Sequence, residues 1–470
     1  MKRNNLYVGL MAFAILLVGA SCSDDDNTPS YSTGVVQNTE LKTILVQRGY
    51  TFNEDGNLLL DDLAKNTTTL DLSGTLISTD ALAELSMFPN LTDVDLSDNG
   101  YGPAFDFAKL PEQITGVDLT GNEIYDFEGL VDASVINDEV QATILHKLTK
   151  LYLPETAKWN VEDLMPFYTK NQTDGTNVDM QMVDEDGNLQ AYNTLREIPD
   201  QYFRAYLKTK FNSLFVDDTH IDISKPMAVE EEGNSIYLWY KNQFADIDKI
   251  ESIEGLEYFV NNPFYKTFYV SIGYATQFTV SYLAPRNNIK GFDATFLDTP
   301  EGIDLSKATK MAFLGLGHNP SITVLDLSNT LVVNQEGDEF DAAIYNGLYL
   351  ESMENLKEII LPNPNKGLTY QICLIDLPSL TTMDLSSVEG LNVLALIKLD
   401  KCNITYPQLK YSYNLMKGFV DLSPTSKASF ALSEDVLEKS STTQFIETYG
   451  ESLSDMEAAY RSYGATKWKK

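Results

Sequence analysis

A seven-residue pattern that recurs along the chain constrains its fold more than any other feature. The pattern is apolar-x-x-apolar-Asp-apolar-Ser/Thr, and its fifth position falls at residues 71, 95, 118 and 152. A second series places the same position at residues 304, 326, 360, 384 and 421. The intervals are 22–24 residues or 34–37 residues. Such a period indicates a repeat architecture in which each unit buries its apolar face against its neighbours.

Several copies extend to LxxLxLxxN, which resembles the signature of leucine-rich repeat proteins. Asn99 and Asn122 stand where that family uses asparagine to bond the backbone of a turn. The resemblance covers most of residues 60–430 and implies an α/β leucine-rich repeat solenoid, with irregular repeats and insertions. Each unit would contribute one short strand whose intervening side chains face outward on the concave side. The segment 311–319 also fits the motif but lies 11 residues before the next copy, so the register there stays open.

The segment Glu197–Leu207 resembles the IPDxxFRxYL helix that opens the repeat domains of internalin-like and BspA-like bacterial surface proteins. A cap in mid-chain predicts a second domain, because the end of a repeat array must cover its apolar face. The sequence therefore predicts two repeat domains with helical caps, at residues 40–185 and 190–470. The second would end in an amphipathic helical tail over residues 430–470.

The N-terminus has the pattern of an export signal. Lys2 and Arg3 precede an apolar run over residues 6–20, which is shorter than the roughly 20 residues of a membrane span. Cys22 follows small residues, as in the lipobox of bacterial lipoproteins, although Gly19 replaces the usual leucine. This predicts a signal peptide at 1–21, lipidation at Cys22 and a flexible tether at 22–39.

The residues directly after Cys22 resemble the surface-export signal of lipoproteins from the Bacteroides group. They are Ser23, Asp24, Asp25 and Asp26. The resemblance implies a lipid-anchored protein of the outer membrane that faces the cell exterior.

Charge and composition exclude several classes of protein. The chain has 34 basic and 68 acidic residues, a net charge of −34, which would repel nucleic acid. Its three cysteines are too few for a disulfide scaffold, and Cys373 and Cys402 could either pair or remain buried thiols. The three histidines show no paired spacing, and no P-loop, Rossmann or nucleophile-elbow motif is present. We therefore expect no enzymatic activity.

The acidic residues of the motif are candidate binding groups on a concave face. They are Asp71, Asp93, Asp95, Asp118, Asp304, Asp326 and Asp384. On strands about 4.8 Å apart, such carboxylates would form a column that favours a cation or a basic partner. The alternative is that they are simply solvated.

Aromatic residues concentrate between residues 237 and 296, and Trp239, Tyr269 and Tyr282 are the candidates for an exposed platform. Phe268, Val270 and Ile272 alternate with Tyr269 and residues 271 and 273, so the first set is expected in the core and the second outside. Exposed Tyr and Trp could stack on sugars or anchor a protein interface, and core packing is the alternative.

One loop weakly resembles an EF-hand. Its candidate calcium ligands are Asn53, Asp55, Asn57 and Asp62, but the first ligand position is Thr51 and the last is Asp instead of Glu. The alternative is a glycine turn between two helices.

These observations together favour a non-catalytic lipoprotein of the cell surface. The expected function is binding or adhesion, with a protein or peptide partner on the concave repeat face. The alternative is a surface glycan-binding lipoprotein of a nutrient-uptake system. Fold-level resemblance alone does not decide between these functions.

Overall fold

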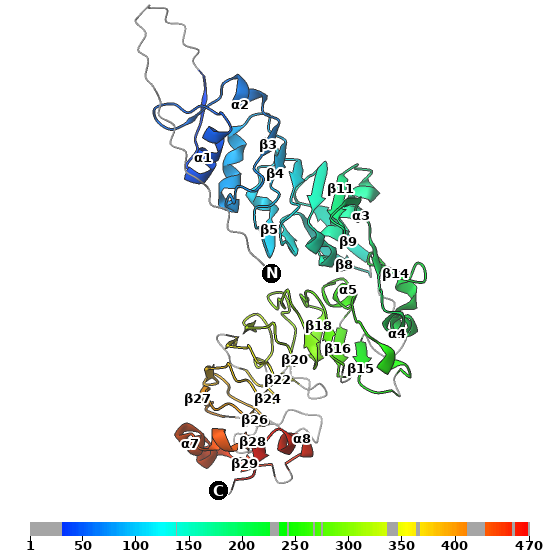
Figure 1. Cartoon of the computed structure of the whole chain (residues 1–470), viewed down its shortest axis with the longest axis vertical. Coiled ribbons are helices and arrows are strands. Elements are labelled where there is room, and N and C mark those ends of the chain that lie inside the picture. Colours follow the sequence, from blue (N-terminus) through cyan, green and yellow to red (C-terminus); the bar gives the residue numbers. More distant parts are fainter. Residues whose placement is uncertain are drawn as a thin grey trace, which may run out of the picture.

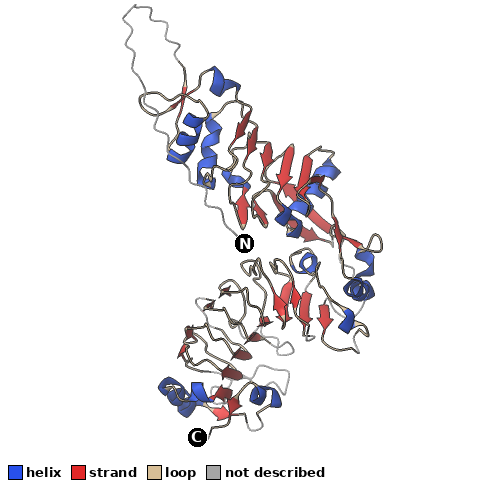
Figure 2. Ribbon diagram, viewed as in Figure 1, coloured by secondary structure: helices blue, strands red, loops and turns tan. Residues whose placement is uncertain are grey.

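The computed structural model describes residues 31–468, apart from 138, 226–234, 242–243, 267, 274–275, 336–345, 363–366, 411–427 and 454–455. Cys22 and Ser23–Asp26 lie outside the described residues. The fold is mixed α/β and strands dominate it (Figures 1 and 2). In the part of the chain that is described, no helix is long and apolar enough to cross a membrane.

The N-terminal half is organised by a six-stranded sheet of order β12-β11-β10-β6-β4-β3. Its strands are β3 (Thr69–Asp71), β4 (Asp93–Asp95), β6 (Gly116–Asp118), β10 (Lys150–Leu153), β11 (Asp179–Val183) and β12 (Leu189–Ala191). All neighbours are parallel except β11 and β12. Asp71, Asp95, Asp118 and Tyr152 are aligned across four strands, so the predicted alignment of this series is confirmed.

The C-terminal half is organised by a ten-stranded sheet (Figure 1). Its strands are β15 (Ser235–Leu238), β16 (Phe268–Ile272), β18 (Ile289–Ala294), β20 (Phe313–Gly317), β22 (Gly347–Glu351), β24 (Gln371–Ile375), β26 (Val393–Ile397), β28 (Ser429–Ser433), β29 (Glu451–Ser452) and β30 (Ala465–Thr466). Only β30 is antiparallel to its partner, β28. Alternate side chains such as Ile236, Val270 and Phe292 face one continuous core.

The prediction of a leucine-rich repeat solenoid is wrong as a fold class, because the structure is a mixed α/β fold built on a large parallel sheet. In the described copies of the second series the motif lies outside that sheet, and the copy at residue 421 lies outside the described residues. Asp326 belongs to the two-stranded sheet of β21 (Val324–Asp326) and β23 (Glu358–Ile360). Asp384 belongs to that of β25 (Thr382–Asp384) and β27 (Asn403–Thr405). Both the motif and the segments between its copies alternate apolar residues, so the sequence period did not show which set forms the sheet.

Helices lie at the ends of the sheets and at their junction (Figure 2). They are α1 (Thr39–Gln47), α2 (Asp62–Asn66), α3 (Leu164–Asp174), α4 (Gln201–Phe211), α5 (Glu257–Val260), α6 (Glu434–Leu437), α7 (Ser440–Tyr449) and α8 (Ala458–Ser462). A helix was expected at α4, and Asp200 caps it by accepting hydrogen bonds from the backbone N–H of Tyr202 and Phe203 at 2.8 Å. The second oxygen of Asp200 accepts from the N–H of Glu251 at 2.9 Å, which fixes the helix to the following segment.

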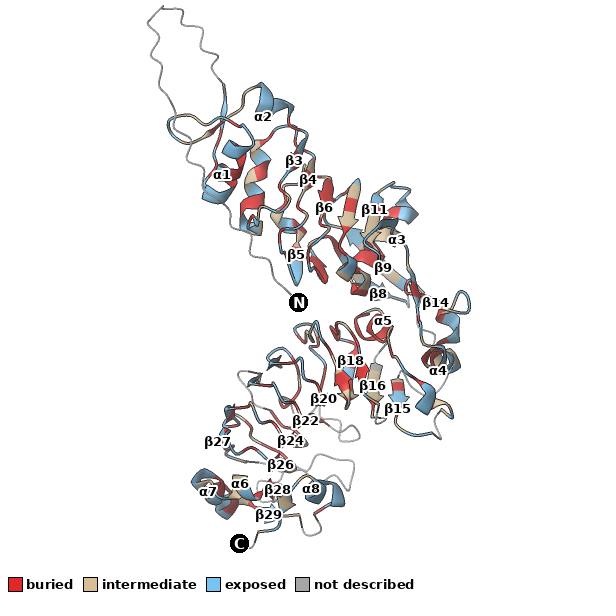
Figure 3. Ribbon diagram, viewed as in Figure 1, coloured by how far each residue is buried: buried red, intermediate tan, exposed pale blue. Residues whose placement is uncertain are grey.

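Buried residues run through both halves (Figure 3), and the two halves share part of a hydrophobic core. One cluster of buried residues fills the N-terminal half. Tyr125, Trp159, Val161 and Met165 belong to the same half in sequence, yet they pack in the cluster of the C-terminal half. The boundary between the halves is therefore in part a packed apolar interface.

Candidate functional site

The ten-stranded sheet has a second face, opposite its main core, which we call the outward face. Because side chains alternate along a strand, the residues between the core positions point to it. One row across it is Tyr237, Ser271, Asp293, Gly315, Tyr349, Cys373, Ala395 and Ala431. Val270 and Ile272 are buried in the core while Tyr269 is partly exposed, so the predicted alternation is confirmed there.

The C-terminal end of the chain covers one part of the outward face. Cys373, Ala395 and Ala431 form a buried cluster with Met456, and Tyr460 packs against it. The thiol of Cys373 lies 3.7 Å from the Tyr460 hydroxyl. This part of the face is thus closed by the protein itself.

The other part of the outward face, on β15, β16 and β18, carries aromatic rings over glycines. A Cβ built on Gly273 would be nearly equidistant from three consecutive carbons of the six-membered ring of Trp239. A point equidistant from three ring atoms lies on the axis through the ring centre, so the indole packs flat on Gly273. Its Nε1–H donates to Ser271 Oγ at 2.6 Å, which holds the ring in this orientation.

The neighbouring strands continue this arrangement. A Cβ at Gly291 would be 3.1 Å from Cδ1 of Tyr269, and one at Gly315 would be 3.4 Å from Cε1 of Phe313. Tyr237, on β15, is 38% exposed. Because these glycines have no side chain, they form a low surface, the glycine floor, on which large neighbouring side chains lie along the sheet.

Asp293 is the acidic group of this region. Its carboxylate lies over Gly315, and none of the described residues donates a hydrogen bond to it. Loss of solvent raises the pKa of Asp293 to about 6. A half-buried carboxylate without donors gains stability from any ligand that supplies them.

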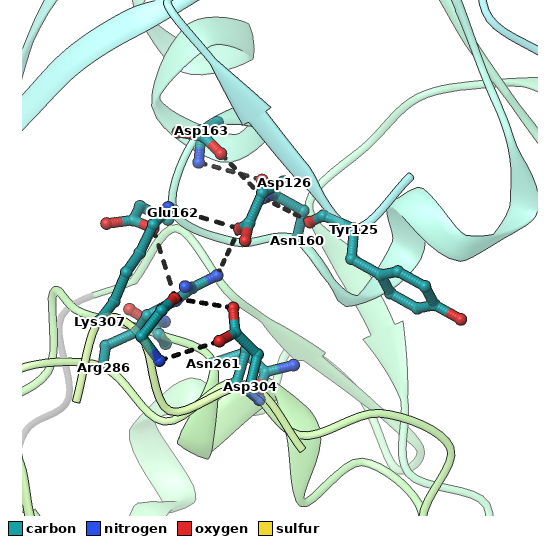
Figure 4. A network of polar contacts seen from close by, with 12 residues as sticks. Tyr125, Asp126, Asn160, Glu162, Asp163, Asn261, Arg286, Asp304 and Lys307 are labelled. Carbon is teal, nitrogen blue, oxygen red and sulfur yellow. Dashed lines mark hydrogen bonds and ion pairs between the residues drawn. The ribbon is translucent and has the colours of Figure 1, made fainter. Parts of the chain in front are cut away.

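A second polar cluster joins the two halves of the chain (Figure 4). Asp126, from β7 (Asp126–Glu128), and Glu162 belong to the N-terminal half. Arg286 and Lys307, from the other half, point toward them. Arg286 Nη2 lies 2.7 Å from Asp126 Oδ1, and Lys307 Nζ lies 2.8 Å from Glu162 Oε2.

The carboxylates of this cluster are close enough together to hold a metal ion. Oxygens of Asp126, Glu162 and Asp163 lie within 4.8 Å of one another. However, Arg286 and Lys307 already supply positive charge at this position, and Asp163 accepts hydrogen bonds from Asn160 Nδ2 at 2.9 Å and the N–H of Phe127 at 3.0 Å. Burial raises the pKa of Asp163 to about 6. Because these carboxylates already have cationic and hydrogen-bonding partners, the cluster fits an ion-pair network better than a metal centre.

In the predicted acidic column, each aspartate carboxylate is hydrogen-bonded to a residue of its own copy of the motif. Asp71, Asp95 and Asp118 each accept hydrogen bonds from the backbone N–H and the hydroxyl two residues later, at 2.6–3.0 Å. Asp71 also pairs with Arg48 at 2.8 Å, and bonds from Ser73 with this pairing lower the pKa of Asp71 to about 2. These carboxylates end their strands by turning the backbone, which is a structural role.

The remaining acidic candidates are dispersed. Asp93 accepts from the Thr92 hydroxyl at 2.7 Å on β4. Asp304, Asp326 and Asp384 each accept from the backbone N–H two residues later at 2.9 Å. Since Asp326 and Asp384 lie on separate two-stranded sheets, the second series forms no continuous column with the first.

Of the aromatic candidates, Trp239 and Tyr269 lie on the outward face, and Tyr282 does not. Tyr282 is 5% exposed, and its ring stacks on Tyr125 with centroids 4.0 Å apart. Of the two possibilities that the sequence left open for Tyr282, an exposed platform and core packing, the structure has the second, in the interface between the two halves.

The weak calcium candidate is a compact turn. Asn53 Oδ1 accepts from the N–H of Asn57 at 2.8 Å, and the ammonium group of Lys42 donates to the carbonyl of Gly56 at 3.1 Å. Asp55 is exposed, and the helix that begins at Asp62 is capped by Asp61 instead. Calcium binding here stays a prediction.

Sequence reasoning did not find the glycine floor or the ion-pair network. Glycines at alternate positions of strand-like segments were a usable signal for the first. For the second, nothing in the sequence relates Asp126 to Arg286. The chain matches no protein-family model and no curated protein.

Proposed function

We propose that this protein is a non-catalytic, lipid-anchored binding protein of the cell surface. Its ligand would lie on the uncovered part of the outward face, on β15, β16 and β18. The observation that carries the proposal is the contrast along this face. The chain closes the part over Cys373 with its own C-terminal residues, and it leaves Tyr237 38% exposed on the other part.

The groups on this face suit binding better than catalysis. Aromatic rings provide large, rigid contact area and can still make polar contacts at their edges. Among the described residues of this face Asp293 is the acidic side chain, whereas acid–base hydrolysis of a glycosidic bond ordinarily needs two carboxyl groups that flank it.

The cellular location rests on the N-terminal sequence. Radiolabelled palmitate should be incorporated into the wild-type chain and lost in Cys22→Ala. Replacement of Asp24, Asp25 and Asp26 by Ala should remove the protein from the reach of protease added to intact cells. Continued labelling of Cys22→Ala would contradict the anchor, and unchanged proteolysis would contradict the export signal.

The binding proposal is tested with the full mature chain carrying Cys22→Ser, so that it can be purified without detergent. It is probed with defined panels of oligosaccharides and of purified extracellular proteins. Tyr237→Arg places a charged side chain on the face, and Val135→Arg does the same at a 44% exposed position of β8 (Val131–Ile136). Binding should be lost in the first variant and kept in the second. Equal binding by both variants, or no binding by the wild type, would overturn the proposal.

A further inference from the structure

The six-stranded sheet ends at β12, and this edge is open. Among the described strands β12 pairs with β11 alone, and all three of its residues are exposed. An open strand edge presents a row of N–H and C=O groups that another strand can bind. We propose that the edge of β12 accepts an extended, basic segment of another protein as an added strand. This is a second binding site, separate from the outward face of the ten-stranded sheet.

The register of the strand pair shows which backbone groups of β12 are available. The N–H of Tyr192 donates to the carbonyl of Met180 at 3.0 Å, so the backbone groups of Tyr192 face β11. In an antiparallel pair the residues face the neighbouring strand alternately. The N–H and C=O groups of Leu189 and Ala191 therefore point to the open edge, and none of the described residues forms a backbone hydrogen bond with them there.

The chain closes an edge of its other sheet. β15 is the first strand of the ten-stranded sheet, and Tyr206 of α4 lies against it. The Tyr206 hydroxyl accepts from the N–H of Tyr237 at 2.8 Å and donates to the carbonyl of Tyr237 at 3.2 Å. A side chain thus occupies both backbone groups at that edge. No described residue does the same at β12, so the edge of β12 is available to a partner strand.

A groove of about 340 Å³ beside β12 determines which charge the partner should carry. Its walls come from β11, β12, β13 (Leu195–Glu197) and the segment that includes α5. The carboxylates that line it are those of Glu155, Asp184, Glu185, Glu197 and Glu254. Lys158 pairs with Glu155 at 3.4 Å and with Glu185 at 3.1 Å. Glu197 and Glu254 form no ion pair with a described residue, so they are free to bind a cation.

Arg196, the other cation of the groove, leaves the groove acidic toward a partner. The residue is only 6% exposed, and its Nη1 donates to the carbonyls of Asn193 and Leu195 at 2.7 and 2.8 Å. The charges that an added strand would meet are therefore mainly those of the carboxylates. A Lys or Arg side chain is their electrostatic complement.

An added strand would direct alternate side chains toward this groove. Gln190 and Tyr192 both line the groove, and they lie on one face of the strand because they are two residues apart. Every second side chain of the added strand would lie on the same face, about 4.8 Å farther out. Backbone pairing would then supply affinity, and basic side chains at alternate positions would supply selectivity.

A second copy of this chain fits the edge poorly. Each copy carries a net charge of −34, and the turn from β11 to β12 contains Asp184, Glu185 and Asp186. Edge-to-edge pairing of two copies would bring these like charges together, whereas a basic partner is attracted by them.

The test measures binding of short synthetic peptides to the full mature Cys22→Ser chain by fluorescence anisotropy at physiological salt. One peptide alternates Lys with Val, and a second alternates Glu with Val. A third is the Lys peptide with every backbone nitrogen methylated, which keeps the charge and removes the N–H donors. The Lys peptide should bind, and the other two should bind at least about tenfold more weakly, the effect of losing two or more hydrogen bonds or the charge match.

Variants of the chain locate the binding. Ala191→Pro removes an N–H from the open edge and keeps the bonds to β11, so it should weaken binding of the Lys peptide about fivefold or more. Ala191→Val should leave it unchanged. Glu197→Gln/Glu254→Gln should weaken it, whereas Glu112→Gln/Glu123→Gln, which removes the same charge at exposed positions elsewhere, should have little effect. Circular dichroism verifies the folding of each variant.

Four results would overturn the inference. Absence of binding by the Lys peptide would remove its basis. Equal binding of the methylated peptide would show general electrostatic attraction in place of strand pairing, and equal binding of the Glu peptide would contradict the charge match. A wild-type dimer that Ala191→Pro dissociates, measured by sedimentation, would assign the edge to a second copy. The peptide comparison uses the wild-type sequence at the edge, so it decides the matter even if a variant fails to fold.

Discussion

Arg286 and Asp126 form a buried ion pair between residues that are 160 positions apart in the chain. The two atoms Nη2 and Oδ1 are 2.7 Å apart, and the residues are 2% and 5% exposed. Charges this deeply buried are stable only when they are paired. Each half of the chain therefore supplies the counter-charge that the other half needs at this point.

Replacement of Arg286 by Met should therefore destabilise the protein strongly. Among the described residues, Lys307, at 3.5 Å, then remains as the cationic partner of Asp126. Breaking a buried pair from one side costs about 3–5 kcal/mol. The free energy of unfolding, measured in urea by tryptophan fluorescence, should fall by an amount of this order.

Two further variants serve as controls for this prediction. Lys109→Met breaks the exposed pair with Asp80 at 3.0 Å, and solvent screening should leave the free energy of unfolding nearly unchanged. The double variant Arg286→Met/Asp126→Leu should recover part of the loss, because it removes both charges of the pair. Equal losses for Arg286→Met and Lys109→Met would show that the pair contributes little.

The pH dependence of stability should depend on Glu257, whose burial raises its pKa to about 7. The folded state then keeps the proton of Glu257 at pH values where the unfolded chain has lost it. This stabilisation is fully present below the ordinary carboxyl pKa and is lost as the pH rises through about 7, with about 1.4 kcal/mol for each unit of pKa shift.

Glu257→Gln should flatten the fall in unfolding free energy between pH 5 and pH 8, because the amide does not titrate. Urea unfolding at the two pH values measures the difference. Glu112→Gln, at an exposed position, should keep the wild-type slope. A slope that Glu257→Gln leaves unchanged would contradict this role of Glu257.

The motif aspartates should affect stability more than ligand binding. Asp95→Ala removes the bonds from the N–H and hydroxyl of Ser97, at 3.0 and 2.7 Å, and should cost about 1 kcal/mol in urea unfolding. Asp95→Asn should cost less because its amide oxygen can still accept. If charge reversal of Asp71, Asp95 and Asp118 together abolished binding of a partner, these carboxylates would have a ligand role as well.

The two described cysteines should be unreactive in the folded protein. Cys373 and Cys402 are both free and buried, and loss of solvent raises their pKa values to about 12 and about 11. The mature lipidated protein should show no thiol reacting with a thiol reagent at pH 8, and two after unfolding in guanidinium. Two reactive thiols in the native state, or none in the unfolded state, would contradict the structure.

The sequence predicted local features well. The resemblance of Glu197–Leu207 to a capping helix indicated the helix that became α4, and the alternation at 269–272 indicated which side chains enter the core. These features depend on neighbours in the chain, so they can be read from a short segment. The alignment of Asp71, Asp95 and Asp118 followed from repeat spacing in the same way.

The amino-acid sequence by itself determined the period of the strands, the helix caps, the net charge and the N-terminal export pattern. Only the tertiary structure decided which strands join the ten-stranded sheet, that Trp239 lies flat on Gly273, and that Arg286 meets Asp126. The physical reason is the range of the interactions. Propensity and capping act over a few residues, whereas strand pairing, ring packing and buried ion pairs join residues that are brought together only when the whole chain folds.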